Sequence, residues 1–198
     1  MHYAEEGIFF TIASIIGTLI IGYFMGKLIK IDKRTSYLIS TGTAICGGSA
    51  IAAISPVIKA EEKQISVALG TIFILNSIAL FLFPIVGHAL ELSQTQFGLW
   101  SAIAIHDTSS VVGAANKFGP QALEVATTIK LARALWIIPI ALLSTILFEN
   151  KGSRIKIPYF IGLFIISMIA NTYSPLVQQY SHYLTAMAKS GLTLTLFL

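Results

Sequence analysis

The sequence predicts an all-α membrane protein, a multi-spanning helical bundle with discontinuous helices, and three observations carry that prediction. Hydrophobic residues fill 55% of the 198 positions and charged residues only 11%, whereas soluble domains carry about 25% charged residues. Apolar runs long enough to cross a bilayer recur along the chain, since a span needs about 20 apolar residues. Two of these runs, residues 38–58 and 97–118, are interrupted by polar or helix-weakening residues.

The other apolar runs predict ordinary spans, at residues 8–26, 65–87, 123–148 and 158–174. A last apolar run begins at residue 189 and continues to residue 198, where the sequence ends inside it. We therefore expect one transmembrane domain over residues 1–198, with its final span incomplete.

Small and polar residues occur within two of the ordinary spans. The first span contains glycines that favour close packing against a neighbouring helix, at Gly17, Gly22 and Gly26. Asn76 lies near the middle of the span at 65–87. Because an amide is expensive to bury in lipid, we expect Asn76 to face a partner helix or a polar cavity.

The basic residues predict the topology. They cluster in two short loops, one with Lys27, Lys30, Lys33 and Arg34, the other with Lys151, Arg154 and Lys156. By the positive-inside rule both loops are cytoplasmic, and this accounts for the net charge of +4 without a nucleic-acid partner. The segments between them return the chain to the side it left. The number of membrane crossings between the two basic loops is even whether the two interrupted segments cross the bilayer or re-enter from one side.

The interrupted segments are the expected transport site. Unpaired backbone groups are tolerated at membrane depth only where they are buried in protein or line a wet cavity, and paired interrupted segments point to a transporter's binding site. The candidate binding residues are Thr43, Gly47, Gly48 and Ser49 in the first segment and His106, Asp107, Thr108, Ser109 and Ser110 in the second, together with Asn76. The alternative is that the glycines serve packing alone.

Asp107 is the only carboxylate well inside an apolar segment. An intramembrane acid is a functional hypothesis by default, and we expect Asp107 to be the coupling acid that binds a cation or carries a proton. The alternative is that Asp107 caps a helix beginning at Thr108 or Ser109. We expect His106 to be hydrogen-bonded or to relay protons. No metal spacing is present, so neither a metal nor another cofactor is predicted.

Lys130 and Arg133 are three residues apart in an apolar span and therefore share one helix face. Facing inward, they would supply surplus positive charge and favour an anionic substrate, helped by helix amino termini at the breaks. The alternative is that both side chains snorkel to the interface. Cys46 is the sole cysteine, and we expect it to serve packing.

Three ordered motifs carry a family resemblance, namely GTAICGGSAIAA at residues 42–53, HDTSSVVGAA at 106–115 and KLARALWIIP at 130–139. On these the chain resembles the YeiH-like family of conserved hypothetical bacterial inner-membrane proteins, which carry the label of sulfate exporters. The resemblance covers the whole chain. It implies a helical carrier related to the cation/proton antiporters and bile-acid symporters, with inverted repeats and crossing broken helices. Family members extend further at both ends, so the sequence resembles a partial chain.

We therefore expect a multi-pass protein of the bacterial inner membrane that works as a secondary transporter or exporter. Its partners would be the lipid bilayer, a small inorganic or organic anion such as sulfate or a related sulfur oxyanion, and a coupling proton or cation. An ion channel and a non-transporting assembly subunit are the alternatives, and a homo-oligomer stays open. A membrane-embedded enzyme is not expected, because the chain contains neither a Gly-x-Ser-x-Gly nor a His-Glu-x-x-His motif.

Overall fold

A computed structural model describes residues 2–148 and residue 166 of the chain. The chain divides into two compact units, residues 1–157 and 158–198, and the description below concerns the first. Apart from residue 166, the spans expected at 158–174 and 189–198 lie outside the described residues.

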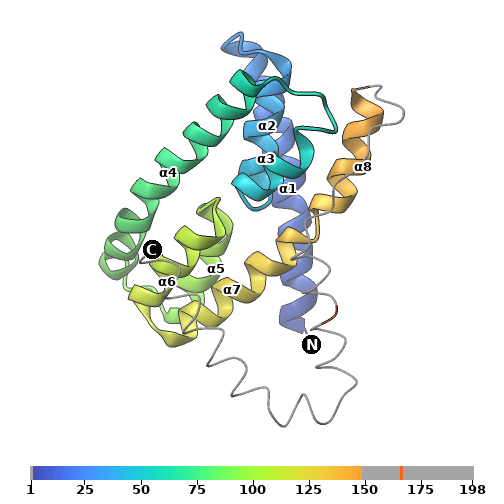
Figure 1. The fold of residues 1–198 in the computed structure, drawn as a ribbon. Helices are drawn as coiled ribbons and strands as arrows, with labels where there is room; N and C mark the ends of the chain where they lie inside the picture. The colour runs from blue at the N-terminus through green and yellow to red at the C-terminus, as the bar shows by residue number, and fades with distance from the viewer. Residues whose placement is uncertain (1, 149–165, 167–198) are drawn as a thin grey trace. The chain divides into compact units, whose positions relative to one another are not determined.

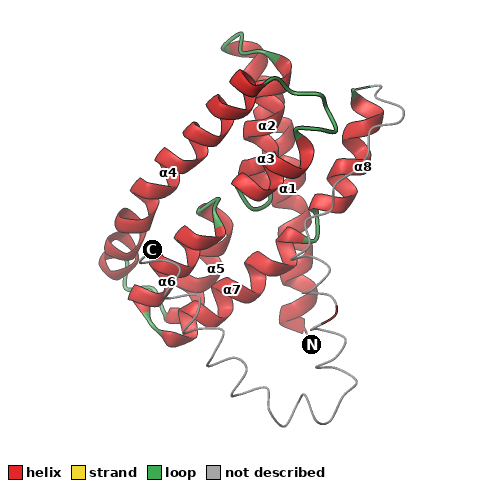
Figure 2. Ribbon diagram, viewed as in Figure 1, coloured by secondary structure: helices red, strands yellow, loops and turns green. Residues whose placement is uncertain are grey.

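The described part of the chain is built from helices and contains no strand (Figures 1 and 2). The helices are α1 (His2–Leu28), α2 (Lys33–Ala44), α3 (Gly48–Ile54), α4 (Glu62–Ala89), α5 (Gln94–Ala104), α6 (Thr108–Phe118), α7 (Pro120–Ala134) and α8 (Ile137–Leu147). Three stretches are long and apolar enough to cross a membrane, Thr11–Leu28, Glu62–Ala89 and Pro120–Leu147. The predicted all-α membrane protein is thus confirmed.

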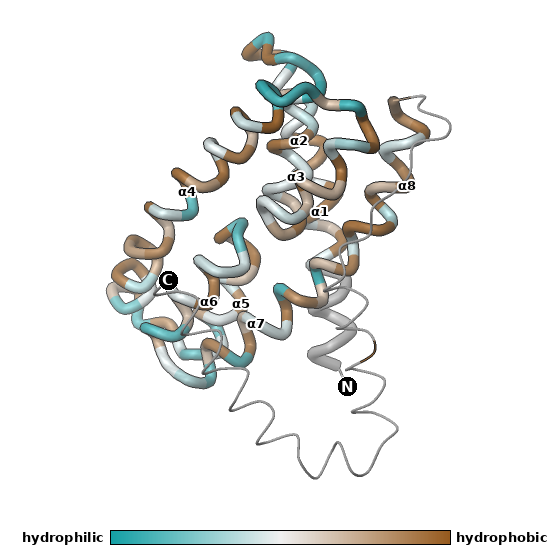
Figure 3. The backbone as a smooth tube through the Cα atoms, viewed as in Figure 1, coloured by the Kyte–Doolittle hydropathy of each residue, from teal (hydrophilic) through white to brown (hydrophobic). Residues whose placement is uncertain are grey.

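Close packing of α1 on α2 explains two of the three glycines in the first span. A β-carbon on Gly22 would collide with Ser40, and one on Gly26 would collide with Ser36. The Ser36 hydroxyl also donates to the Gly22 carbonyl at 3.1 Å. Gly17, in contrast, would have no neighbour within 4 Å. The helices therefore approach through the glycines nearer the loop. Many apolar side chains on α1 and α4, such as Ile21 and Ile85, are exposed and available for contact with lipid, and Figure 3 shows the hydropathy of these helices along the backbone.

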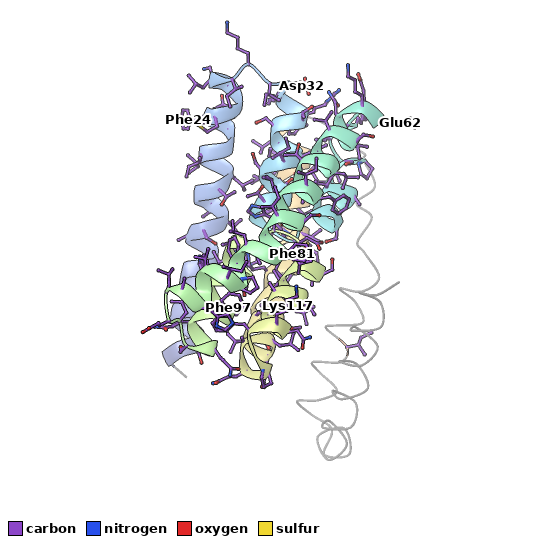
Figure 4. The ribbon with its side chains drawn as sticks, turned by 90° about the vertical axis from the view of Figure 1, so that its left-hand side faces the viewer. Phe24, Asp32, Glu62, Phe81, Phe97 and Lys117 are labelled. Carbon is purple, nitrogen blue, oxygen red and sulfur yellow. The ribbon has the colours of Figure 1, made fainter. Side chains whose placement is uncertain are left out.

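The first interrupted segment is a hairpin whose two arms begin and end at the same side of the molecule. Asp32 caps α2 by accepting from the backbone N–H groups of Arg34 and Thr35, at 3.0 and 3.1 Å. The same carboxylate accepts from Nε2 of Gln64, in the first turn of α4, at 2.7 Å. The chain therefore leaves this side in α2 and is back there when α4 begins. Figure 4 shows Asp32 and Glu62 at the same end.

The second interrupted segment is a hairpin that begins at the far end of α4. Helix α5 follows the end of α4 after a short loop at residues 90–93. The side chain of Gln94, at the start of α5, accepts from the backbone N–H of Gln121 at 2.9 Å, and Gln121 lies in the first turn of α7. The chain therefore departs in α5 and returns in α6 to the same side, opposite to that of the first hairpin (Figure 1).

These connections favour re-entry over crossing for both interrupted segments. The long helix α4 carries the chain from the first hairpin's side to the second's, and α7 with α8 carries it back, where the hydroxyls of Tyr37 and Ser144 join α2 to α8 at 2.8 Å. The loop at 90–93 contains no lysine or arginine and so suits the outer side. Crossing segments would have placed this loop in the cytoplasm. The resemblance implied broken helices that cross each other. In the structure, the two broken segments are instead hairpins that enter from opposite sides.

The span expected as one helix at 123–148 is divided into α7 and α8 by a turn at Leu135 and Trp136. Pro139 supplies the physical reason, because proline lacks the N–H that would donate to the Leu135 carbonyl and its ring crowds that carbonyl. The sequence contained this signal. The turn comes directly after the segment that carries Lys130 and Arg133.

An apolar cluster packs α5, α6 and α7 against the end of α4. Phe97 is fully buried, and its ring stacks on that of Phe118 at a centroid distance of 3.9 Å. A β-carbon on Gly87 would meet both rings, so only glycine leaves room for this pair on α4. The cluster holds the second hairpin in place below its tip.

Candidate functional site

The tips of the two hairpins meet each other. Gly47, in the turn between α2 and α3, has a φ of +68°, a backbone conformation that glycine adopts without steric cost. A β-carbon there would lie 3.2 Å from the α-carbon of Asp107 and 3.3 Å from the carbonyl oxygen of His106. Those two residues form the turn between α5 and α6. We call the contact of Gly47 with His106 and Asp107 the hairpin junction.

Lys130 and Arg133 reach the hairpin junction from α7 and bind backbone carbonyls at the carboxyl ends of α2 and α5. The Lys130 ammonium donates to the carbonyl of Ile105 at 2.8 Å and to that of Ala102 at 3.5 Å. The Arg133 guanidinium donates through Nη1 to Ile103 at 3.4 Å and through Nη2 to Ala44 at 2.5 Å. Arg133 therefore joins one hairpin to the other.

Both cations are buried. Lys130 and Arg133 are each 1% exposed, so the structure favours the inward-facing arrangement over snorkelling. Within the described residues neither has a carboxylate in salt-bridge range. Their negative partners are the helix ends, because the last carbonyls of a helix lack intrahelical donors and carry about half an elementary negative charge. Two interrupted helices end here in the same place, which explains why two cations are needed.

Asp107 is the N-cap of α6. Its Oδ2 accepts from the backbone N–H of Ser110 at 3.1 Å, from the Ser110 hydroxyl at 3.3 Å and from the Ser109 hydroxyl. The capping alternative raised by the sequence is therefore realised in the structure. The three donors all bind the same carboxylate oxygen.

Asn76 supports the second hairpin from α4. Its Oδ1 accepts from the backbone N–H of His106 at 3.0 Å, a donor that the end of α5 leaves without a helical partner. Because a backbone N–H can only donate, this contact fixes which amide atom is oxygen and leaves Nδ2 elsewhere. Asn76 is 2% exposed, and among the described residues Nδ2 has no hydrogen-bond partner. Asn76 therefore faces the second hairpin, as expected, but only its Oδ1 atom is hydrogen-bonded there.

Two further buried nitrogens at the hairpin junction also lack partners in the described part of the chain, Nδ1 of His106 and Nε of Arg133. The His106 ring faces the backbone of Thr43 in the first hairpin. Buried polar groups in native proteins are almost always hydrogen-bonded, to protein or to other molecules. These three nitrogens therefore leave hydrogen-bonding capacity for water or a ligand at the junction.

The remaining predicted residues line the two turns. Cys46 and Ser49 contact each other through Sγ and Oγ at 2.7 Å, and Cys46 is buried. Gly48 faces the ring of Phe73 on α4, while Thr43 and Thr108 are half-buried. The structure thus brings the predicted residues to the same pair of turns. The carbonyls of Ala44, Ala102, Ile103 and Ile105 were not predicted, because every residue carries a carbonyl and side-chain patterns do not mark which are free.

Within residues 11–148 no group of three or more histidine, cysteine, aspartate or glutamate side chains is placed to hold a metal ion. The polar groups at the junction are instead hydrogen-bond donors and cations, together with one capping carboxylate. Such a set suits oxygen-rich or anionic ligands better than a metal.

The fold and this site define an integral membrane protein of the all-α class, in which two re-entrant hairpins from opposite sides meet beside buried cations. The chain belongs to the family described as conserved hypothetical protein 698, whose family model matches residues 2–197. Related bacterial sequences also bear the name UPF0324 membrane protein. The family named from the three motifs is thereby confirmed, as is a bacterial membrane location.

Three relatives illustrate the match. UPF0324 membrane proteins of Bacteroides thetaiotaomicron and Porphyromonas gingivalis are 60% and 54% identical to this chain, each over 98% of it. One from Vibrio parahaemolyticus is 53% identical over 100% of the chain. The chain covers 59%, 60% and 66% of these relatives' own lengths, respectively. No solved structure matches the chain.

Proposed function

We propose that the protein is a secondary transporter that moves a small anion by alternating access, coupled to a proton or another cation. The observation that carries this proposal is the meeting of two helix breaks beside Lys130 and Arg133, away from the ends of α4. Helix ends and unwound backbone at membrane depth are the usual elements of a transporter's central site. A lipid-facing or purely structural bundle has no need for two such breaks in contact.

The charges at the hairpin junction favour an anion. Each helix end carries roughly half an elementary charge, so the carboxyl ends of α2 and α5 offset about one of the two cationic charges. Asp107 adds one negative charge, of which the amino end of α6 offsets about half. The amino end of α3, whose N-cap is Gly47, adds about half a positive charge, so with Lys130 and Arg133 both ionised a surplus of roughly one positive charge remains. The surplus attracts an anion without requiring an anion for folding.

The unpartnered donors refine the assignment of roles. Nδ2 of Asn76 and Nε of Arg133 have no acceptors among the described residues, and an anion with several oxygen atoms, such as sulfate or sulfite, supplies acceptors to both. Thr43, Gly47, Gly48 and Ser49 would contribute backbone and hydroxyl contacts from the first hairpin. His106, Thr108, Ser109 and Ser110 would do so from the second.

Uptake into liposomes tests the proposal. Purified protein is reconstituted, and accumulation of labelled sulfate is measured with unlabelled sulfite and chloride as competitors. We expect saturable uptake that responds to an ion gradient and is strongly reduced in Arg133→Gln, with Lys117→Gln as the matched control because Lys117 lies over the ring of Phe81, away from the junction. Absence of sulfate uptake would refute sulfate as the transported anion, and non-saturating uptake would favour the channel.

A further inference from the structure

The sequence made Asp107 the expected carrier of the coupling proton, but the hydrogen bonds at the junction favour Lys130. Oδ2 of Asp107 accepts from Ser110 and Ser109 and caps α6. All of these bonds are made to one carboxylate oxygen at the start of the helix. Asp107 therefore has a structural role as the cap of α6.

Lys130, in contrast, has fewer hydrogen-bond acceptors around it than an ammonium group has donors. An ammonium group carries three N–H donors, and only two acceptors lie near it in the described part of the chain, the carbonyls of Ile105 and Ala102. A neutral amine has two N–H donors, which match these two carbonyls. Lys130 can therefore lose its third proton and keep both hydrogen bonds that hold it to the end of α5.

We infer that Lys130 carries the coupling proton and that the anion moves in the same direction as this proton. This inference rests on the proposed function. On one side of the membrane, water delivers a proton to the amine, and the resulting ammonium together with Arg133 holds the anion. On the other side, the anion leaves and the third proton of the ammonium passes to water. One proton and one anion cross in each cycle.

The net charge at the hairpin junction couples the binding of the proton to the binding of the anion. With Lys130 protonated, the surplus is about one positive charge, and with Lys130 neutral it falls to about zero. The anion therefore binds well only after the proton has bound. Because such coupling is reciprocal, bound anion also strengthens proton binding on Lys130.

Four other ionisable groups act on Lys130 from the surrounding elements. Arg133 lies one turn further along α7, Cys46 lies in the turn between α2 and α3, and Asp107 and His106 lie in the turn between α5 and α6. Helix α5 itself contains no ionisable side chain. Of these groups, Arg133 stays charged throughout, and Asp107 is committed to its cap.

The test compares the wild type with Lys130→Arg, which keeps a charge that arginine does not release. Sulfate uptake is measured with the outside more acidic, or more basic, than the inside. We expect the wild type to be about fivefold or more faster with the acidic side outside, while Lys130→Arg takes up sulfate at similar rates under both gradients. Lys117→Arg should behave as the wild type. Faster uptake with the acidic side inside, or an unchanged gradient response in Lys130→Arg, would overturn the inference.

Two further measurements keep the inference separate from the proposed function. The first is the pH dependence of the melting temperature in detergent, from about pH 6 to about pH 9, which we expect to be flatter in Lys130→Arg. Parallel profiles would refute the titration of Lys130 even if no tested anion is transported. The second is Lys130→Gln, which retains a donor for the Ile105 carbonyl. If Lys130→Arg fails to fold, Lys130→Gln should take up sulfate slowly under either gradient, and gradient-dependent uptake at the wild-type rate would contradict a proton on Lys130.

Discussion

Gly47 and Asp107 are in backbone contact although 60 positions separate them in the sequence, since a β-carbon on Gly47 would lie 3.2 Å from the Asp107 α-carbon. The φ of Gly47 is +68°. Two independent constraints, one conformational and one steric, therefore require glycine at the tip of the first hairpin.

Gly47→Ala should destabilise the protein. A non-glycine residue held at this backbone conformation costs of order 1–3 kcal/mol, and the added methyl group also presses on the second hairpin. We expect a melting temperature several degrees lower by fluorescence-detected unfolding in detergent. Gly70→Ala is the matched control, because Gly70 lies in α4 with nothing within 4 Å of the added carbon. Equal melting temperatures for the two variants would refute the contact.

Arg133→Leu should destabilise the contact between the two hairpins more than Arg133→Lys does. Leucine leaves the carbonyls of Ala44 and Ile103 without their donor, and hydrogen bonds to a charged group contribute about 1.5–3 kcal/mol each. Lysine keeps a charge and can reach one of the carbonyls. The measurement is the melting temperature of each purified variant. A leucine variant as stable as the wild type would show that the guanidinium is dispensable for the fold.

Asp107→Ala should remove a helix cap that Asp107→Asn retains. Loss of an N-cap typically costs about 1 kcal/mol, while asparagine caps nearly as well as aspartate. We expect the alanine variant to melt at a lower temperature and the asparagine variant to stay near the wild type. By the charge count at the junction, asparagine makes the site more positive by one charge, so sulfate should bind Asp107→Asn before Lys130 is protonated and the gradient response of uptake should weaken. A gradient response equal to that of the wild type in a stable Asp107→Asn variant would refute this charge count.

Gly22→Val should disturb the packing of α1 on α2, because a β-carbon on Gly22 collides with Ser40. Overpacking a close contact typically costs about 1–3 kcal/mol. The control is Gly17→Val on the same helix, where the added carbon meets nothing within 4 Å. Stability of both variants is compared by thermal unfolding. A larger loss at Gly17 than at Gly22 would contradict the arrangement of these two helices.

Labelling of single cysteines tests the re-entrant hairpins. In a Cys46→Ser background, Lys30→Cys and Glu61→Cys should react with a membrane-impermeant maleimide from the same side, and Glu91→Cys from the opposite side. All three positions are exposed. If residues 38–58 crossed the bilayer, Lys30→Cys and Glu61→Cys would react from opposite sides. Labelling in intact cells and in inverted vesicles distinguishes the two outcomes.

The sequence predicts the helical class, the two interruptions and the shared face of Lys130 and Arg133, because hydropathy and spacing are local properties. The direction of the chain after each interruption could not be predicted. It depends on contacts between distant residues, such as Asp32 with Gln64. The carbonyl groups that bind Lys130 and Arg133 could not be predicted either, because the fold decides which carbonyls lack a helical donor. The turn before α8 could have been anticipated from Pro139.

The double attachment of Arg133 has a mechanical consequence. Arg133 on α7 donates to the end of one arm of each hairpin, so the two tips cannot separate without breaking at least one of these hydrogen bonds. Opening the junction by parting the hairpins is therefore the most costly route. If α7 and both hairpins move together as one rigid piece, these hydrogen bonds stay intact. This is the motion that the structure favours.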